Sequence, residues 1–168
     1  MDTLYAPWRE KYIVCRDEKQ EKILPACVFC VPDKNDPVKN GCILKQFEYV
    51  SVLLNLYPYN AGHLLITPRT HVTFLHELPE RELTDMMKLT SKSAQILQNA
   101  LGAQGVNVGM NLGAVAGAGI PGHLHMHLVP RWPGDTNFMP VIGQTKQVSI
   151  DMQRVHADLL PHFEKLEI

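Results

Sequence analysis

The sequence predicts an α+β fold with a mainly antiparallel five-stranded sheet, one long helix and a C-terminal helix. Five short apolar segments are typical of strands, whereas only two segments carry helical spacing. The connections between the strand segments are too short for βαβ crossovers, which favours antiparallel pairing. A chain of 168 residues can bury a hydrophobic core, so we expect residues 1–168 to form a single domain.

The first 41 residues carry no strand pattern. Residues 1–24 resemble an N-terminal extension, with a short amphipathic helix expected around residues 8–14. Residues 25–41 are expected to form a loop, because prolines and an Asn-Gly pair interrupt any regular element. This loop contains a Cys-x-x-Cys pair, Cys27 and Cys30.

Three strands are expected next, at residues 43–47, 49–56 and 63–67. The second is rich in Val and Leu, which suits a strand. The Pro-, Asn- and Gly-containing segment 57–62 predicts a turn before the third strand, and Pro68 is expected to end that strand.

The longest helix is expected from Pro79 to Leu101. Pro79 suits a first helical position, and Glu80 and Glu82 suit the positive end of the helix dipole. Gly102 is expected to end the helix. One apolar face follows a spacing of 3.6 residues and contains Leu83, Met86, Thr90, Ala94, Leu97 and Leu101.

Two further elements complete the expected fold. Residues 106–111 predict a strand, and residues 140–168 predict a C-terminal helical tail. One side of this helix is expected to carry Val155, Leu159, Phe163 and Leu166. Pro161 is expected to kink it.

The last strand is expected to contain three histidines that alternate with apolar residues. The alternation places His123, His125 and His127 on one face of a strand. The other face takes Leu124, Met126 and Leu128. On a helix, residues two apart diverge by about 200°, so the imidazoles would not converge. A row of imidazoles indicates chemistry, and the alternative is an ordinary solvated strand face.

A glycine-rich segment, residues 113–122, directly precedes these histidines and contains four glycines in ten residues. Backbone N–H groups in such a loop can bind a phosphate. Two interpretations of the histidines follow: a multi-histidine metal site, or one imidazole that attacks a substrate while its neighbours orient it and bind charge. The glycine loop favours the second, although a flexible turn would also explain it.

Composition limits the classes of partner. The formal net charge of -1 gives no sign of a surface for nucleic acid polymers. No apolar run approaches the ~20 residues that a membrane helix needs, and the opening residues hold no apolar signal core, so we expect a cytoplasmic protein. In such a protein, Cys27 and Cys30 favour a metal or redox pair. Cys15 and Cys42 are expected to be packing residues.

The motifs resemble a known family. The segment His123–Val129 matches the His-φ-His-φ-His-φ-φ signature, with φ a hydrophobic residue, of the histidine-triad family of nucleotide hydrolases and transferases. Segments Asn55–Leu64, Asn107–Gly113 and Val129–Phe138 resemble its bacterial branch related to diadenosine tetraphosphate phosphorylases. The resemblance covers about residues 5 to 160.

The resemblance implies an enzyme that cleaves dinucleoside polyphosphates at the α-phosphate through a nucleotidyl-histidine intermediate. His125 matches the nucleophile, His127 the supporting third histidine, and His63 a histidine from a neighbouring strand. Asn55 matches a position that contacts ribose. The implied phosphate-side residues are Asn111, Gly117 and Gly119. The family usually forms dimers that join two sheets edge to edge, so we expect a homodimer.

The resemblance also implies a structural zinc ion. Some branches hold it with a Cys-x-x-Cys pair, a loop histidine and the first triad histidine, which here are Cys27, Cys30, His71 and His123. Two thiolates and two imidazoles make a closed tetrahedral site. His76 is the alternative loop ligand, and a metal-free or redox pair of thiols is the alternative to zinc.

One segment departs from the family pattern. Many members carry Ser, Thr or Gln just before the triad, whereas residues 118–122 hold no side-chain hydroxyl or amide. Backbone N–H groups and histidines would then hold the phosphate, which leaves substrate preference open. A nucleoside phosphoramidase, a nucleotide-binding module with vestigial activity and a metal-binding protein are therefore the alternatives.

Weaker candidates lie outside these motifs. Trp132 and Phe138 suit either stacking on a base or packing. Arg131 suits a phosphate contact or a solvated position, and His156 and His162 are expected on the surface of the C-terminal helix.

Overall fold

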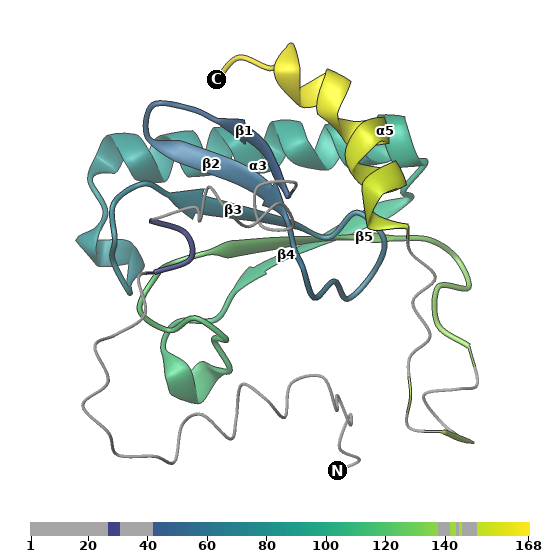
Figure 1. Cartoon of the computed structure of the whole chain (residues 1–168). Coiled ribbons are helices and arrows are strands. Elements are labelled where there is room, and N and C mark those ends of the chain that lie inside the picture. The colour runs from purple at the N-terminus through teal and green to yellow at the C-terminus, as the bar shows by residue number, and fades with distance from the viewer. Residues whose placement is uncertain (1–26, 31–41, 138–141, 144, 146–150) are drawn as a thin grey trace.

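A computed structural model describes residues 27–30, 42–137, 142–143, 145 and 151–168 (Figure 1). Its sheet has the order β1-β2-β3-β5-β4, and every neighbouring pair is antiparallel. The strands are β1 (Ile43–Gln46), β2 (Val50–Leu54), β3 (Leu64–Pro68), β4 (Gly105–Met110) and β5 (Met126–Arg131). The helical elements are η2 (Leu75–Glu77), α3 (Glu80–Leu101), η3 (Ala114–Ala116) and α5 (Met152–Glu164). The predicted α+β class, with five strands, a long helix and a C-terminal helix, is confirmed.

The predictions for residues 1–24, Cys15 and Phe138 fall outside the described residues.

One connection differs from the prediction. Strands β3 and β4 both pair antiparallel with β5, so they run in the same direction. Helix α3 joins them and β5 lies between them, which makes a split βαβ unit. The expectation that no connection is long enough for a crossover is therefore wrong here, because the segment that contains α3 spans the whole interval between β3 and β4.

One face of the sheet forms the core against α3, which lies along it in Figure 1. Alternate strand residues point to this face and are almost fully buried: Val50, Val52, Leu54, Leu64, Ile66, Met126 and Leu128. Helix α3 adds Met86, Leu89 and Leu97, and α5 adds Leu159 and Phe163. The intervening residues point to the opposite face, which leaves that face available for a site.

Helix α3 begins one residue later than predicted, with Pro79 as the residue before its first turn. Gly102 ends it in the left-handed conformation, at φ 64°, as predicted. Glu82 is buried, and its carboxylate accepts hydrogen bonds from the Thr70 hydroxyl (2.5 Å) and the Thr70 backbone N–H (3.3 Å). Its main contacts are therefore with a loop, beyond its predicted effect on the helix dipole.

Helix α5 packs on β1 and α3 with the predicted apolar side inward. Lys45 on β1 holds the following segment, because its Nζ donates to the carbonyls of Glu164 (2.9 Å) and Leu166 (2.6 Å). His156 is half-buried, with its Nε2 3.4 Å from the Ile43 carbonyl, so the expectation of a surface position is wrong for this residue; His162 is exposed. None of the described helices is long and apolar enough to span a membrane.

Candidate functional site

His63, just before β3, contacts His127 on β5. The Tyr59 backbone N–H donates to Nδ1 of His63 (3.1 Å), and the Asn55 Nδ2 lies 3.2 Å from the same nitrogen. The Tyr57 N–H donates to Oδ1 of Asn55 (3.0 Å), which orients that amide. Since donors face Nδ1 of His63, its ring proton belongs on Nε2, which then donates to Nδ1 of His127 (3.0 Å). The backbone thus sets the orientation of both rings.

His125 is 5% exposed and presents one ring nitrogen. Its Nδ1–H donates to the His123 carbonyl (2.8 Å), so the lone pair lies on Nε2. Within the described part of the chain, no residue hydrogen-bonds this Nε2. Burial lowers the pKa of His125, although the bond to His123 acts in the opposite direction. The rings of His127 and Phe29 lie 5.0 Å and 5.5 Å away, so a neutral imidazole with an available lone pair is held between them.

The three triad histidines do not form a single row. Strand β5 begins at Met126, so His123 and His125 precede it, and only His127 lies within the strand. Leu124 donates its N–H to the Val72 carbonyl (2.7 Å), outside the main sheet ladder. The prediction of one strand face is therefore wrong for His123, whose ring lies with the cysteines, while the apolar alternation into the core is confirmed.

A cluster of Cys27, Cys30, His71 and His123 has ligand atoms all within 4.8 Å of one another. Nδ1 of His123 lies 3.3 Å from each sulfur and 3.2 Å from Nδ1 of His71. Nε2 of His123 lies 2.9 Å from the Pro68 carbonyl, a bond that places the ring proton on Nε2 and the lone pair of Nδ1 toward the cysteines.

These four groups fit a tetrahedral cation. Ligand distances of about 2.0–2.1 Å for nitrogen and about 2.3 Å for sulfur imply tetrahedral edges of roughly 3.3–3.8 Å, close to the separations in the cluster. The carbonyl bond behind His123 is the outer contact that metal-bound imidazoles commonly make. The alternative ligand, His76, lies elsewhere and stacks on Phe74, with ring centroids 5.6 Å apart.

The glycine-rich loop braces itself. Gly117 adopts φ 92°, and Nδ2 of Asn111 donates to its carbonyl (3.4 Å). Open space surrounds the position where a side chain at Gly119 would lie. Ile120 of this loop reaches the wall of a cavity described next. The hydrogen bonds of the described residues join Asn111 to Gly117 but join neither to the histidines.

A cavity of about 230 Å³ lies over the face of the sheet opposite α3. Apolar side chains line much of it, among them Phe29 from the Cys-x-x-Cys turn, Leu53 from β2 and Leu65 from β3. Asn55 also lines it and links it to His63. An apolar cavity with a few polar groups at one end is typical of a small-molecule site.

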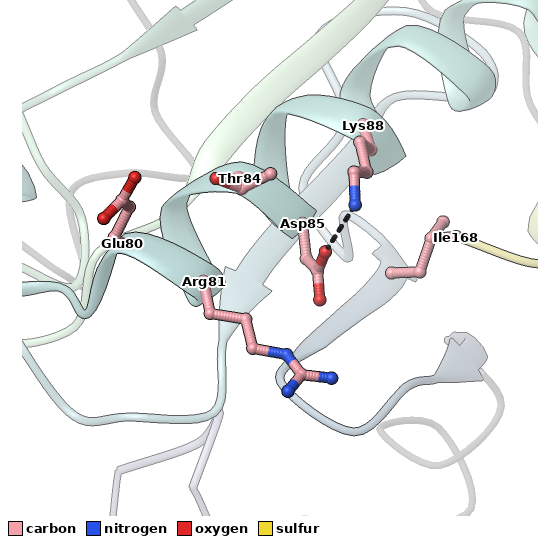
Figure 2. Close-up of a pocket in the computed structure, with 6 residues that line it drawn as sticks. All are labelled: Glu80, Arg81, Thr84, Asp85, Lys88 and Ile168. Atoms are coloured by element: carbon pink, nitrogen blue, oxygen red, sulfur yellow. Dashed lines mark hydrogen bonds and ion pairs between the residues drawn. The ribbon is translucent and has the colours of Figure 1, made fainter.

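A second hollow, of about 470 Å³, lies over the first turns of α3 beside the C-terminal Ile168 (Figure 2). Its lining is charged and open to solvent. Lys88 and Asp85 form an ion pair there (3.3 Å), as the dashed line in Figure 2 shows. None of the predicted site residues lines this hollow, so it offers no chemistry comparable to that of the first cavity.

Residues 37–134 match the HIT domain family model, which covers more than half of the chain. The chain belongs to the HIT domain family. It is similar to AP-4-A phosphorylase of Mycobacterium tuberculosis, at 36% identity over 152 residues that make up 88% of this chain and 77% of that protein. It is also similar to adenosine 5'-monophosphoramidase of Saccharomyces cerevisiae, at 29% identity over 141 residues, 83% of this chain and 84% of that protein.

The fold of this HIT protein also has solved counterparts. A Zn-bound histidine triad family protein from Mycobacterium smegmatis superposes with a TM-score of 0.65 at 24% sequence identity. The superposition covers 83% of this chain and 94% of that one. The family prediction and the predicted fold are therefore both confirmed.

The weaker candidates of this HIT protein have structural partners. The Arg131 guanidinium makes two bonds to Asp135 (2.6 and 2.8 Å) and one to Asn107 (2.9 Å). Nε1 of Trp132 donates to the Leu101 carbonyl (3.2 Å), which supports packing against α3 over base stacking. Cys42 is buried in the core, as predicted.

Sequence reasoning missed two contributors to the site. Phe29 contacts His125 and lines the cavity, and its place between the two cysteines was the available signal. The Pro68 carbonyl orients His123, and no side-chain pattern could have indicated it.

Proposed function

We propose that this HIT protein cleaves dinucleoside polyphosphates, such as diadenosine tetraphosphate, at the α-phosphate through a nucleotidyl-histidine on His125. The observation that supports this most is the lone pair on Nε2 of His125, held by the His123 carbonyl beside the cavity. The activity named for the mycobacterial relative favours this substrate class.

In the proposed reaction, Nε2 of His125 attacks the α-phosphorus and the P–O bond to the remaining phosphates breaks. From diadenosine tetraphosphate this step releases ATP and leaves adenylyl-His125. His127, oriented by His63, lies next to His125 and would stabilise charge on the phosphoryl oxygens. Water or inorganic phosphate then breaks the P–N bond and regenerates the imidazole.

The other predicted contacts complete the proposal. Asn55 would bind ribose from its place at the mouth of the cavity. The backbone of the glycine loop, with Asn111, Gly117 and Gly119, would face the phosphate chain. Because residues 118–122 hold no hydroxyl or amide side chain, this contact depends on backbone N–H groups.

A product assay tests the reaction. The protein is mixed with diadenosine tetraphosphate with and without inorganic phosphate, and the nucleotides are identified. Phosphorolysis gives ADP and ATP, whereas hydrolysis gives AMP and ATP. Tight nucleotide binding with no turnover would instead support a binding module. Faster turnover of adenosine 5'-phosphoramidate would support the phosphoramidase alternative, which the yeast relative favours.

Substitution of the nucleophile is the first prediction. His125→Ala removes the attacking nitrogen, so turnover should fall by at least about a thousandfold, as for other covalent nucleophiles. His162→Ala changes an exposed histidine on α5 and is the matched control. Unchanged turnover in His125→Ala with a normal circular dichroism spectrum would refute the assignment.

The second prediction concerns the Cys/His cluster, for which we propose structural zinc. Metal analysis should give about one zinc per chain, and Cys27→Ala should lose it, because a closed tetrahedral site needs all four ligands. His76→Ala should retain it, since His76 lies outside the cluster. A stoichiometric metal that survives Cys27→Ala but is lost in His125→Ala would identify an all-histidine site instead.

A further inference from the structure

A row of polar side chains crosses the cavity far from the histidines. Gln46 on β1 pairs in register with Ser51 on β2, and Ser51 pairs with Thr67 on β3. All three line the cavity of about 230 Å³, whose remaining wall is largely apolar. Three adjacent strands therefore place polar groups at one level of an otherwise apolar site.

Two of these side chains are buried with no partner for their hydroxyls. Thr67 is 2% exposed and Ser51 is 9% exposed. Within the described residues, neither hydroxyl forms a hydrogen bond. A buried hydroxyl without a partner is unfavourable by about 1–3 kcal/mol, and native proteins rarely leave one so. A Val or Ile at position 67 would fill the same space in a central strand, so a ligand is the natural source of the missing hydrogen bonds.

The spacing along the strands agrees with the shape of a nucleotide. Successive residues on this face of β2 and its extension are Ser51, Leu53 and Asn55, and each step of two residues covers about 6.8 Å. Asn55 lies next to His63, at the end where ribose and phosphate are proposed to bind. Leu53 and its partner Leu65 offer an apolar surface for a base, and the polar row follows beyond it.

We propose that the hydroxyls of Ser51 and Thr67, supported by the amide of Gln46, hydrogen-bond the exocyclic edge of the nucleobase and thereby select the base. This inference rests on the proposed function. The edge of adenine pairs an amino donor with an adjacent ring-nitrogen acceptor, and two hydroxyls can accept from one and donate to the other. A purine without the amino group would leave a buried hydroxyl unpaired and should bind more weakly.

Calorimetric titration with two ligands tests the selection. AMP is compared with purine riboside 5'-monophosphate, which differs by the absence of the amino group. Wild-type protein should bind AMP about five- to tenfold more tightly, the value of one such hydrogen bond. Thr67→Val should reduce this ratio, and the double variant Ser51→Ala/Thr67→Val should bring it close to one.

The matched control is Thr67→Ser, which keeps the hydroxyl and should keep most of the preference for AMP. A ratio that stays unchanged in Thr67→Val and in the double variant would overturn the inference, as would equal binding of both ligands by the wild type. These outcomes leave the proposed function intact, because diadenosine tetraphosphate would still be cleaved. If the wild type binds neither ligand, the proposed function fails and the inference fails with it.

Discussion

At the scale of single residues, Asp135 joins the loop after β5 to the turn before His63. Its carboxylate accepts from the Arg131 guanidinium, from Nδ2 of Asn60 (2.8 Å) and from the Trp132 N–H (3.3 Å). Asn60 also donates to the Pro130 carbonyl (2.9 Å). These bonds hold the turn whose Tyr59 N–H orients His63, so a carboxylate remote from the chemistry supports the site.

The Arg131 guanidinium beside Asp135 holds the pKa of that carboxyl far below its usual range. Asp135→Asn should lower the free energy of unfolding by about 1–3 kcal/mol at pH 7, because several charge-assisted bonds are lost. A depressed pKa in the folded state contributes stability above the unfolded pKa of about 3.9, and this contribution is lost as pH falls further. The difference from wild type should therefore shrink below about pH 4.

Urea unfolding at pH 7 and pH 3 measures this dependence. Asp158→Asn is the control, since Asp158 is 51% exposed and faces Arg154 at 3.9 Å on α5, and its effect should be near zero at both pH values. An equal loss for Asp135→Asn at pH 7 and pH 3 would show that the carboxylate charge does not stabilise the fold.

Residue patterns predicted the chemistry-bearing side chains but not what orients them. The motif indicated Cys27, Cys30, His71 and His123 as one group, and the structure brings them together. The ring orientations depend on the Pro68 carbonyl, the His123 carbonyl and the Tyr59 N–H. These are backbone atoms that every residue type possesses, so no side-chain pattern can indicate which of them will meet an imidazole.

At the scale of elements, α3 acts through Glu82 on the loop that carries His71. The buried carboxylate binds the hydroxyl and the N–H of Thr70, the residue before His71. Glu82→Gln should lower the free energy of unfolding by about 1–3 kcal/mol, because the amide replaces one acceptor with a donor at a buried site. It should also weaken metal binding, since the loop that positions His71 loses its anchor.

Urea unfolding and competition for zinc with a chromogenic chelator measure the two effects. Glu80→Gln is the matched control, because Glu80 lies exposed in the same helical turn. Wild-type zinc affinity in a destabilised Glu82→Gln would separate the two effects and refute the link to His71.

The elements themselves were predicted from local periodicity within one to three residues at most ends. The exception is the start of the last strand, where the alternation extends to His123 but the ladder begins at Met126. The reason is physical, because alternation records which side chains face the core, whereas the ladder depends on partner strands. The partner of Glu82 was missed likewise, since helical spacing indicates a buried face and not the loop that meets it.

At the scale of the whole molecule, the sheet has two edges with different surroundings. Helix α5 packs on β1, whereas β4 forms the other edge and carries Val108, which is 48% exposed. This order was not predictable from the strand segments, because β5 follows β4 in sequence yet lies between β3 and β4. Only long-range pairing decides that insertion. That residues 1–168 form a single domain stays a prediction.

The exposed edge suits the homodimer that we propose. An edge strand presents unpaired N–H and C=O groups, and proteins commonly cover such a row or place charges on it. Strand β4 (Gly105–Met110) contains no charged residue, and Val108 adds an apolar surface. Val108→Lys should place a charge at the centre of the edge and convert a dimer to a monomer, which sedimentation velocity would measure.

Met87→Lys is the control, because Met87 is similarly exposed, at 53%, but lies on α3 away from the edge. It should leave the sedimentation coefficient unchanged. A monomeric wild type would show that the homodimer proposal is wrong, whereas a Val108→Lys protein that remains dimeric would place the interface elsewhere. Because the product assay can be run on the same Val108→Lys monomer, it also shows whether the site formed by β2, β3 and β5 within one chain suffices for turnover.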